Sequence, residues 1–314
     1  MPNLGGNQVS VDLKELIHDE ALRLGFSHCG IARNDSLEEK RHFYSTFIKQ
    51  YGHSGLSYLE TYFEKRLHPE LVMEGTKTII ALLMNYFSAE IIPDNDNFVI
   101  AKYAYGADYH VLIKDRLHEL VNFLQHSGNN VRAKAFVDSG PVLEKAWAQK
   151  CGVGWQGKNT LIINKTAGSF FFIGIILTDL ELEPDPPETD HCGTCMVCVS
   201  ACPTGALDTP YQLDIPRCIS FLTLENKEEI PENLRSKLND RIYGCDICQD
   251  VCPYNRFANA QPDSGFKASE RLLQMRKKDW LSLNEPMFDE LFADSPVKRI
   301  GYKRLIYNIR AATK

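Results

Sequence analysis

The chain has 314 residues, of which 44% are hydrophobic and 24% are charged. This is the balance of a folded soluble protein, so disorder over most of the length is excluded and a sizeable core can form. The net charge of −6 excludes a protein that coats nucleic acid electrostatically, so any such contact must be local. No secretory or twin-arginine leader and no apolar run of about 18 residues is visible, which predicts a cytoplasmic protein without a membrane segment.

The first 180 residues alternate between helical and strand patterns. Helices are predicted, in chain order, over residues 9–25, 37–51, 56–67, 109–127 and 141–150. Strands are predicted over residues 26–32, 78–87, 133–137, 161–163 and 169–178. The alternation predicts an α/β or α+β domain in which helices cover a mixed sheet.

A proline-rich acidic segment at residues 181–190 interrupts this pattern. Beyond it, eight of the ten cysteines lie between residues 192 and 252, and the chain after residue 262 is helical in pattern and rich in lysine and arginine. The sequence therefore predicts an α/β binding domain at 1–180, a cysteine-rich module at 181–262 and a basic helical tail at 263–314.

The cysteine-rich module carries two related motifs. The first, from Cys192 to Pro203, is C-x2-C-x2-C-x3-C-P, which is the bacterial ferredoxin signature for [4Fe–4S] clusters. The second, from Cys245 to Pro253, lacks one cysteine, and Cys218 is the nearby thiol that can replace it. Counting ligands predicts two clusters, the first held by Cys192, Cys195, Cys198 and Cys252 and the second by Cys202, Cys218, Cys245 and Cys248.

A pair of zinc sites is the alternative, since each would also use four cysteines, but zinc does not require C-x3-C-P twice. The remaining cysteines, Cys29 and Cys151, stand in apolar surroundings and are expected to be ordinary buried residues. Two clusters carry single electrons but perform no organic chemistry alone. The large upstream domain is therefore expected to hold a substrate, a second cofactor or both.

Asp138 stands out in the first domain because it follows an apolar strand, where α/β proteins place their ligands. A partly desolvated carboxyl there could have a raised pKa and donate a proton. The alternative is that Asp138 caps a helix that begins near Pro141. His110, in an aromatic segment at residues 101–110, is on its own more typical of a hydrogen-bonded structural residue.

Several segments in this order resemble the epoxyqueuosine reductase family over residues 10–260. They are Val-Asp-Ser-Gly-Pro-Val-Leu-Glu at 137–144, Gly-Trp-Gln-Gly-Lys-Asn-Thr at 154–160, the ferredoxin run, and the stretches at 217–223 and 241–249. The resemblance implies an oxidoreductase that uses cobalamin (cob(II)alamin) and two [4Fe–4S] clusters. The implied reaction removes the epoxide oxygen of epoxyqueuosine in tRNA and gives queuosine.

The resemblance also implies roles for individual residues. It makes Asp138 the proton donor to the opening epoxide and Arg66, in Lys-Arg-Leu-His-Pro, a corrin contact. It further implies that the corrin is lined by Ala101, Leu143, Ile162, Ile173 and Ser220, with Asp246 beside the second cluster.

The implied partners are a tRNA with epoxyqueuosine in its anticodon and an external low-potential electron donor, with the protein acting as a monomer. Longer members of the family carry a C-terminal helical-repeat domain, so this chain is expected to be a short form. Binding of tRNA would then depend on the catalytic module and on basic residues of the tail, namely Lys277, Lys278, Lys298, Arg299, Lys303 and Arg304. The alternative is that these residues form only a solvated helix face.

Two other functions share some of these features. A reductive dehalogenase also pairs a corrinoid with two clusters, but such enzymes usually carry the twin-arginine leader that is not seen here. A plain ferredoxin-type electron carrier would need the clusters alone. A corrinoid absorption band in the purified protein would separate that carrier from the two enzymes.

Overall fold

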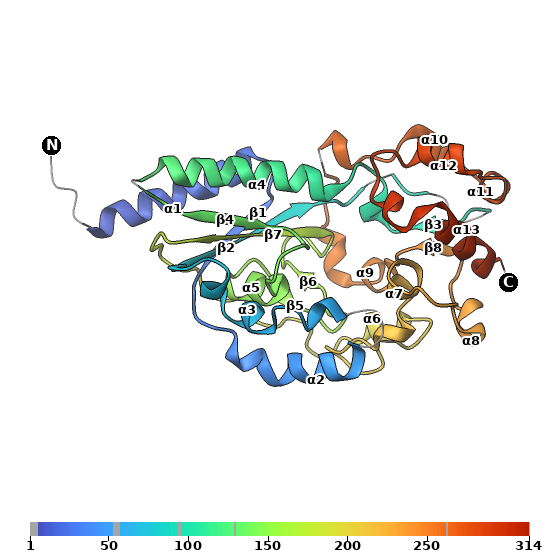
Figure 1. Ribbon diagram of the computed structural model, residues 1–314, viewed down its shortest axis with the longest axis horizontal. Coiled ribbons are helices and arrows are strands. Elements are labelled where there is room, and N and C mark those ends of the chain that lie inside the picture. The colour runs from blue at the N-terminus through green and yellow to red at the C-terminus, as the bar shows by residue number, and fades with distance from the viewer. Residues whose placement is uncertain are drawn as a thin grey trace.

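The structure is a computed structural model that describes residues 6–52, 57–88, 90–92, 96–128, 130–261 and 263–313. A four-stranded sheet lies between two layers of helices, and the cysteine-rich module and the tail lie together beyond one end of this sheet (Figure 1). Within the described residues, no helix combines the length and the apolar character needed to cross a bilayer.

The sheet has the order β1-β2-β7-β4 and is antiparallel throughout. Its strands are β1 (His28–Arg33), β2 (Thr78–Asn85), β4 (Ala133–Phe136) and β7 (Phe171–Thr178). In the two central strands, Ile80 of β2 lies opposite Ile176 of β7, and both are fully buried. Helices on both faces of the sheet explain why β2 reads as a continuous apolar run rather than an alternating one.

Apolar stripes on the helices build one core on each face of the sheet. On one face, Ile17 of α1 (Gly6–Arg23) and Leu117 of α4 (Tyr109–His126) pack in the same cluster as Ile80. On the other face, Trp147 of α5 (Glu144–Lys150) packs with Ile175 of β7. The other helices of this domain, drawn below the sheet in Figure 1, are α2 (Arg41–Tyr51) and α3 (Phe63–Leu67).

The cysteine-rich module has little regular structure. Its helices are α6 (Val197–Ala201), α7 (Ile219–Leu224), α8 (Glu232–Arg235) and α9 (Ile247–Asp250), and a hairpin from the first domain, β5 (Trp155–Gln156) and β6 (Ile162–Ile163), reaches it. Short 3-10 turns connect the elements: η1 (Glu38–Lys40), η2 (Ser57–Leu59), η3 (Pro69–Leu71), η4 (Lys102–Ala104), η5 (Ile215–Arg217), η6 (Pro253–Phe257), η7 (Ser264–Phe266) and η8 (Pro296–Ile300).

The tail is anchored to both preceding parts of the chain. Its helices are α10 (Glu270–Gln274), α11 (Lys277–Leu281), α12 (Glu285–Leu291) and α13 (Gly301–Ala312). Trp280 of α11 shares a core with Phe98 from the first domain and with Ile242 of β8 (Arg241–Tyr243). The strand β8 itself pairs in parallel with β3 (Val99–Ile100), so a two-stranded sheet joins the first domain to the module.

The predicted combination of helices and sheet is confirmed, but the four-stranded sheet is antiparallel throughout rather than mixed, and two helices differ locally from the prediction. The helix expected over 56–67 is interrupted because Tyr62 has a left-handed backbone (φ +65°), so only η2 and α3 form; residue 56 lies outside the described residues. The helix expected from Pro141 begins three residues later, at Glu144, with Leu143 at its N-cap.

Candidate active site

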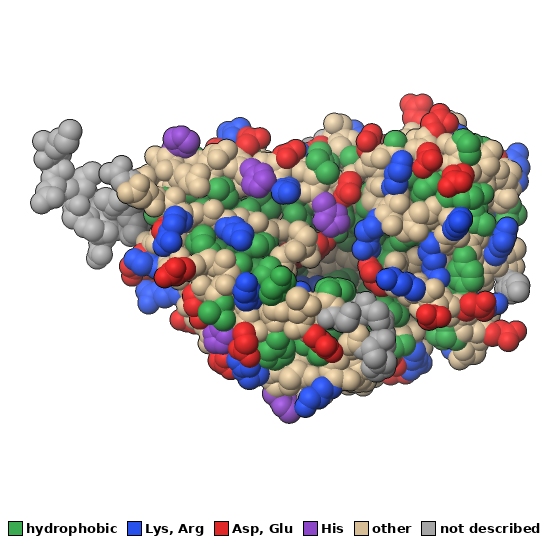
Figure 2. Space-filling model, viewed as in Figure 1, with side chains coloured by type: hydrophobic (Ala, Val, Ile, Leu, Met, Phe, Trp, Pro, Cys, Tyr) green, Lys and Arg blue, Asp and Glu red, His purple; other side chains and the backbone are tan. Residues whose placement is uncertain are grey.

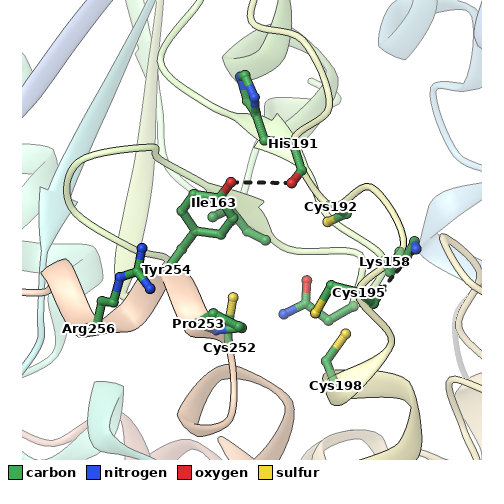
Figure 3. Close-up of a pocket in the computed structure, with 11 residues that line it drawn as sticks. Lys158, Ile163, His191, Cys192, Cys195, Cys198, Cys252, Pro253, Tyr254 and Arg256 are labelled. Carbon is green, nitrogen blue, oxygen red and sulfur yellow. Dashed lines mark hydrogen bonds between the residues drawn. The ribbon is translucent and has the colours of Figure 1, made fainter.

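One cavity of about 250 Å³ is lined by four thiols, those of Cys192, Cys195, Cys198 and Cys252 (Figure 3). The first three come from the turn that leads into α6 and from α6 itself, whereas Cys252 immediately precedes η6. The short spacings of the first motif keep its thiols on one loop, and the second motif supplies the fourth thiol from the opposite wall.

Hydrogen bonds hold this cavity in shape. The side chain of Lys158 is buried and donates to the carbonyl oxygens of Gly193 at 2.6 Å and Cys195 at 2.9 Å. Trp155 Nε1 donates to Cys192 Sγ at 3.5 Å. Tyr254 donates to the His191 carbonyl at 3.2 Å, which is a dashed line in Figure 3. A buried cation and an N–H donor beside thiols are what a negatively charged iron–sulfur cluster requires, because hydrogen bonds to the sulfurs tune such clusters.

The other four cysteines of the module form a second group. Cys218 is the N-cap of α7, and it lies near Cys202, Cys245 and Cys248 although 27 positions separate it from Cys245. Burial, with a smaller contribution from the neighbouring Cys218, raises the pKa of the Cys245 thiol to about 12. Burial also holds the pKa of Cys248 well above its usual range, with added effects of Cys245 and Cys218.

The arrangement of these thiols bears on whether they could hold a single zinc ion or a multinuclear cluster. Among the described residues, no three His, Cys, Asp or Glu side chains converge closely enough to hold a single ion. A tetrahedral zinc ion needs sulfurs about 3.8 Å apart, because each Zn–S bond is about 2.3 Å long. Four thiols around a cavity of about 250 Å³ leave room for a multinuclear cluster, which is the group that the ferredoxin-type spacing predicts.

A second cavity, of about 600 Å³, lies at the junction of the three parts of the chain. The face seen in Figure 2 is hollowed near its middle, where the start of α4 and the module approach each other in Figure 1. The cavity is lined by aromatic, ionisable and a few smaller side chains: Tyr58, Tyr103, Tyr109, His110, Asp138, Ser139, Leu224, Glu225, Tyr243, Pro296 and Arg299.

Asp138 is held at the edge of this cavity just after β4. Its backbone is left-handed (φ +52°), a conformation that aspartate and asparagine tolerate better than most residues. Its backbone N–H donates to Glu144 Oε1 at 2.6 Å, and its carboxylate accepts a hydrogen bond from Tyr109 Oη. The alternative that Asp138 caps a helix is wrong, because α5 begins at Glu144 and has no side-chain cap.

Two neighbours of Asp138 keep their protons. Burial and then the negative charge of Asp138 hold the pKa of Glu144 well above its usual range. The same two causes, in the same order, raise the pKa of Tyr109, whose ring is stacked on Phe172 of β7 at a centroid distance of 4.0 Å. Asp138 therefore stands between two protonated groups, both positioned by the sheet and by α5.

Of the eight positions expected to contact a cofactor, all of which the structure describes, only Asp138 lines this cavity. Arg66 lies close to it, since its Nη1 donates to the Gly140 carbonyl at 3.4 Å. The Nε atom of Arg66 is buried and has no hydrogen-bond partner among the described residues. A Cβ on Gly140 would lie 2.2 Å from the Phe136 ring, so this loop cannot carry a side chain at that position without moving.

The other expected positions fall into two groups. Leu143, Ile162 and Ile173 belong to the apolar cluster beneath α5. Ala101 and Asp246 lie together beside the second group of cysteines, where the Lys102 N–H donates to Asp246 Oδ2 at 2.7 Å. Ser220 lies in the first turn of α7, two positions after Cys218.

Most of the basic tail residues expected to contact tRNA make contacts within the chain. Lys277 pairs with Asp240 at 2.8 Å, and Arg299 pairs with Glu225 at 2.7 Å on the wall of the cavity. Lys298 and Arg304 are also engaged, with Asp289 and with backbone carbonyls respectively. Lys278 and Lys303 are exposed.

Sequence reasoning did not single out several residues that the cavity brings to Asp138. Glu144 ends the segment at 137–144, and its acidic side chain at the start of α5 was a usable signal, since carboxylates favour the first turn of a helix. Tyr58 and Glu225 had no such signal, because each comes from a different part of the chain, and Arg299 was singled out only as a basic tail residue.

Comparisons with known protein families give matches in the cysteine-rich module and in the first domain. Residues 191–255, which contain all eight cysteines of the module, match the 4Fe-4S double cluster binding domain. Residues 66–139 match the family described as epoxyqueuosine reductase QueG, DUF1730.

Full-length relatives carry the same description. The epoxyqueuosine reductase of Cellulophaga algicola is 44% identical over 94% of this chain and 96% of its own length. The epoxyqueuosine reductase of Escherichia coli is 36% identical over 96% of this chain and 82% of its own. A crystal structure of epoxyqueuosine reductase with an epoxyqueuosine-modified tRNA-Tyr stem loop superimposes with a TM-score of 0.86 at 30% identity, covering 96% of this chain and 81% of that one.

Proposed function

The chain belongs to the epoxyqueuosine reductase family, and from this premise we propose that it reduces epoxyqueuosine in tRNA to queuosine. One observation carries the proposal: a cavity edged by Asp138 lies beside a module that matches a 4Fe-4S double cluster domain. An acid and a source of single electrons are the two things that reductive opening of an epoxide needs.

The eight cysteines of the module would bind the two [4Fe–4S] clusters. Cys192, Cys195, Cys198 and Cys252 line one cavity, which supports their assignment to the first cluster. The mutual proximity of Cys202, Cys218, Cys245 and Cys248 supports their assignment to the second. The second group is next to Asp246 and Ala101, so the second cluster would stand between the first and the cavity of Asp138.

Cobalamin would be the second cofactor, as the family implies. When bound, it would supply the strongly reducing cobalt that delivers electrons to the epoxide carbon. The unpartnered Nε atom of Arg66 supports a polar ligand at this place, because a buried donor without a partner costs about 1–3 kcal/mol unless something else accepts its hydrogen bond. Arg66 would bind a polar edge of the corrin, and the remaining contacts would come from Ala101, Leu143, Ile162, Ile173, Ser220 and Asp246.

Asp138 would donate the proton to the opening epoxide. An epoxide opens poorly without acid, because the leaving alkoxide is strongly basic. The hydrogen bond from Tyr109 and the backbone bond to Glu144 fix the carboxyl at the cavity edge, where a substrate oxygen can reach it. General acids placed in this way contribute about 10²–10⁴-fold to a rate.

The substrate would be the modified nucleoside in a tRNA anticodon, and a relative bound to such a stem loop supports this. The lining of tyrosines, His110 and Arg299 suits a planar base and an anionic backbone. An external low-potential donor would reduce the first cluster, and the protein would act as a cytoplasmic monomer.

Anaerobic incubation of the protein with epoxyqueuosine-containing tRNA and a chemical reductant tests the proposal. Digestion of the tRNA and nucleoside mass measurement should show a product one oxygen atom lighter, and the protein should carry a corrinoid absorption band. Unchanged nucleoside in a protein with full iron and corrinoid would refute the proposed reaction. A protein with clusters but without corrinoid would instead favour the plain electron carrier.

A further inference from the structure

The proposed reaction consumes more protons than one carboxyl can hold. Conversion of an epoxide to an alkene breaks both C–O bonds, places two electrons on the carbons and releases the oxygen as water. The oxygen must therefore acquire two protons in each turnover, while Asp138 carries one. Asp138 has to regain a proton before the cycle is complete, and the source of that proton is the question that the structure addresses.

His110 is the group best placed to return it. Its Nε2 atom lies 3.8 Å from Asp138 Oδ2, and it lines the same cavity. Its Nδ1 atom lies 2.8 Å from Asp108 Oδ1, and the same carboxylate oxygen accepts the His110 backbone N–H at 3.0 Å as the N-cap of α4. The side chain of His110 is 36% exposed, so it reaches both the cavity and solvent.

We propose that His110, oriented by Asp108, carries a proton from solvent to Asp138 during each turnover. This inference rests on the proposed function. In the protonated ring, Nδ1–H donates to Asp108 and Nε2–H faces Asp138. Transfer moves that Nε2 proton to Asp138 Oδ2 and leaves a neutral ring that still donates to Asp108; Nε2 then takes a proton from water. Because 3.8 Å exceeds a direct hydrogen bond, one bridging water or a small closure on substrate binding completes the path.

Asp108 helps His110 to take up a proton from solvent and holds its ring in place for the transfer. A carboxylate that accepts from one ring nitrogen fixes the ring orientation and the tautomer, and it stabilises the charged ring that must exist before transfer. The ring of His110 is also stacked on Tyr109 at a centroid distance of 4.1 Å, which limits its rotation. Both constraints come from the first turn of one helix, so His110 and Tyr109 approach Asp138 together.

The neighbouring groups are less suited to this task. Tyr109 holds its proton, because its pKa is raised by burial and by Asp138, and Glu144 accepts from the Asp138 backbone N–H but does not line the cavity. The other titratable or charged groups that line the cavity and face His110 from the module, the tail and the first domain are Tyr58, Tyr103, Tyr243, Glu225 and Arg299. Among these, Glu225 and Arg299 are paired with each other at 2.7 Å.

The substitution His110→Gln tests the relay, since it retains the helix and a polar side chain but carries no titratable proton. We expect turnover to fall by about 10²-fold, with iron and corrinoid contents unchanged. We also expect the variant to lose the fall in rate that deprotonation of a histidine produces between pH 5 and 8, and added imidazole to restore part of the rate. The matched control is His126→Gln, an exposed histidine at the other end of the same helix, which should behave as the unsubstituted protein.

A second variant keeps the test independent of folding. Asp108→Asn retains the N-cap, because asparagine and aspartate cap helices about equally, but removes the charge that stabilises the ring. It should lower turnover with iron and corrinoid contents unchanged, because the ring loses the acceptor that orients it. A wild-type rate and pH profile in His110→Gln, or a loss that imidazole does not restore with the profile unchanged, would overturn the relay alone. Unconverted nucleoside with the unsubstituted holoprotein would instead refute the proposed function and, with it, the relay.

Discussion

The two cavities of this protein are built in opposite ways. The thiol-lined cavity takes three of its four cysteines from residues 192–198, where short spacings fix their geometry, and the fourth, Cys252, from the second motif. The cavity of Asp138 draws its walls from η2, the start of α4, the loop after β4, the end of α7, β8 and η8. The first cavity therefore depends on local sequence, and the second on the packing of the whole chain.

This difference explains why the two sites respond differently to substitution. A cluster ligand contributes a bond that no neighbour replaces, so its loss should be large and specific. A residue of the second cavity is supported by partners from other segments, so its substitution should change rate or proton affinity while the cofactors remain. The expected effects therefore range from the loss of a cluster to a change in the pH dependence of stability.

Cys218 gives the most direct test of this difference, because it is the proposed cluster ligand that stands outside both local motifs. The substitution Cys218→Ala should leave the second cluster with three thiolates, lower the iron content or give a three-iron cluster, and abolish turnover. Iron analysis and electron paramagnetic resonance measure this. The control Cys151→Ala removes a fully buried cysteine from the core beneath the sheet and should leave iron unchanged. Full iron and an unaltered spectrum in Cys218→Ala would remove Cys218 from the ligand set.

Asp138→Asn tests the chemistry of the second cavity, because it removes an acidic proton with little change in the shape of the side chain. Asparagine tolerates the left-handed backbone of this position and keeps the backbone N–H that donates to Glu144, but it has no acidic proton. Turnover should fall by about 10²–10⁴-fold with iron and corrinoid still bound. Nucleoside mass measurement under single-turnover conditions gives the rate. Near-normal turnover with full cofactor loading would return Asp138 to a structural role.

The same contrast sets how much the sequence could predict. The cysteine motifs predicted the module because their spacing is recognisable in the sequence, and the strand before Asp138 was visible as an apolar run. Tyr58, Glu225 and Arg299 could not be assigned to the cavity, because the core shared by the tail, β8 and the first domain brings their segments together. The strand β7 begins 86 residues after β2 ends. The antiparallel pairing of these two strands is likewise a long-range contact that the periodicity of the sequence does not predict.

Lys158→Met should weaken the loop that carries the cysteines of the first cavity. The substitution removes two hydrogen bonds from a buried ammonium to the Gly193 and Cys195 carbonyls, each of which contributes about 1.5–3 kcal/mol when a charged group is involved. The loop of the first cluster should loosen, so iron should be released several-fold faster to a chelator, with the initial iron content near normal. The exposed Lys165→Met is the matched control. Equal release rates in the two variants would show that Lys158 does not support the loop.

Glu144→Gln should produce the smallest effect, a change in how stability depends on pH. The pKa of Glu144 is raised in the folded protein, so its contribution to stability is fully present below the unfolded value of about 4.5 and is lost as the pH rises toward the folded value. Over that interval the folded state keeps a proton that the unfolded chain has released. The free energy of unfolding should therefore decrease by up to about 1.4 kcal/mol per pH unit from this group alone.

Glutamine is neutral at every pH and its side-chain oxygen can still accept the Asp138 N–H, so the variant should lack this slope. Denaturant unfolding of the anaerobic holoprotein between pH 5 and 8 should show that the free energy of unfolding of the variant rises relative to that of the unsubstituted protein as the pH increases. The exposed Glu74→Gln should show the same pH dependence as the unsubstituted protein. Because the charge of Asp138 is one cause of the raised pKa, Asp138→Asn should reduce the gain. Parallel curves for Glu144→Gln and the unsubstituted protein would mean that Glu144 is ionised in the folded state, and Asp138 would then have a second carboxylate beside it rather than a neutral acid.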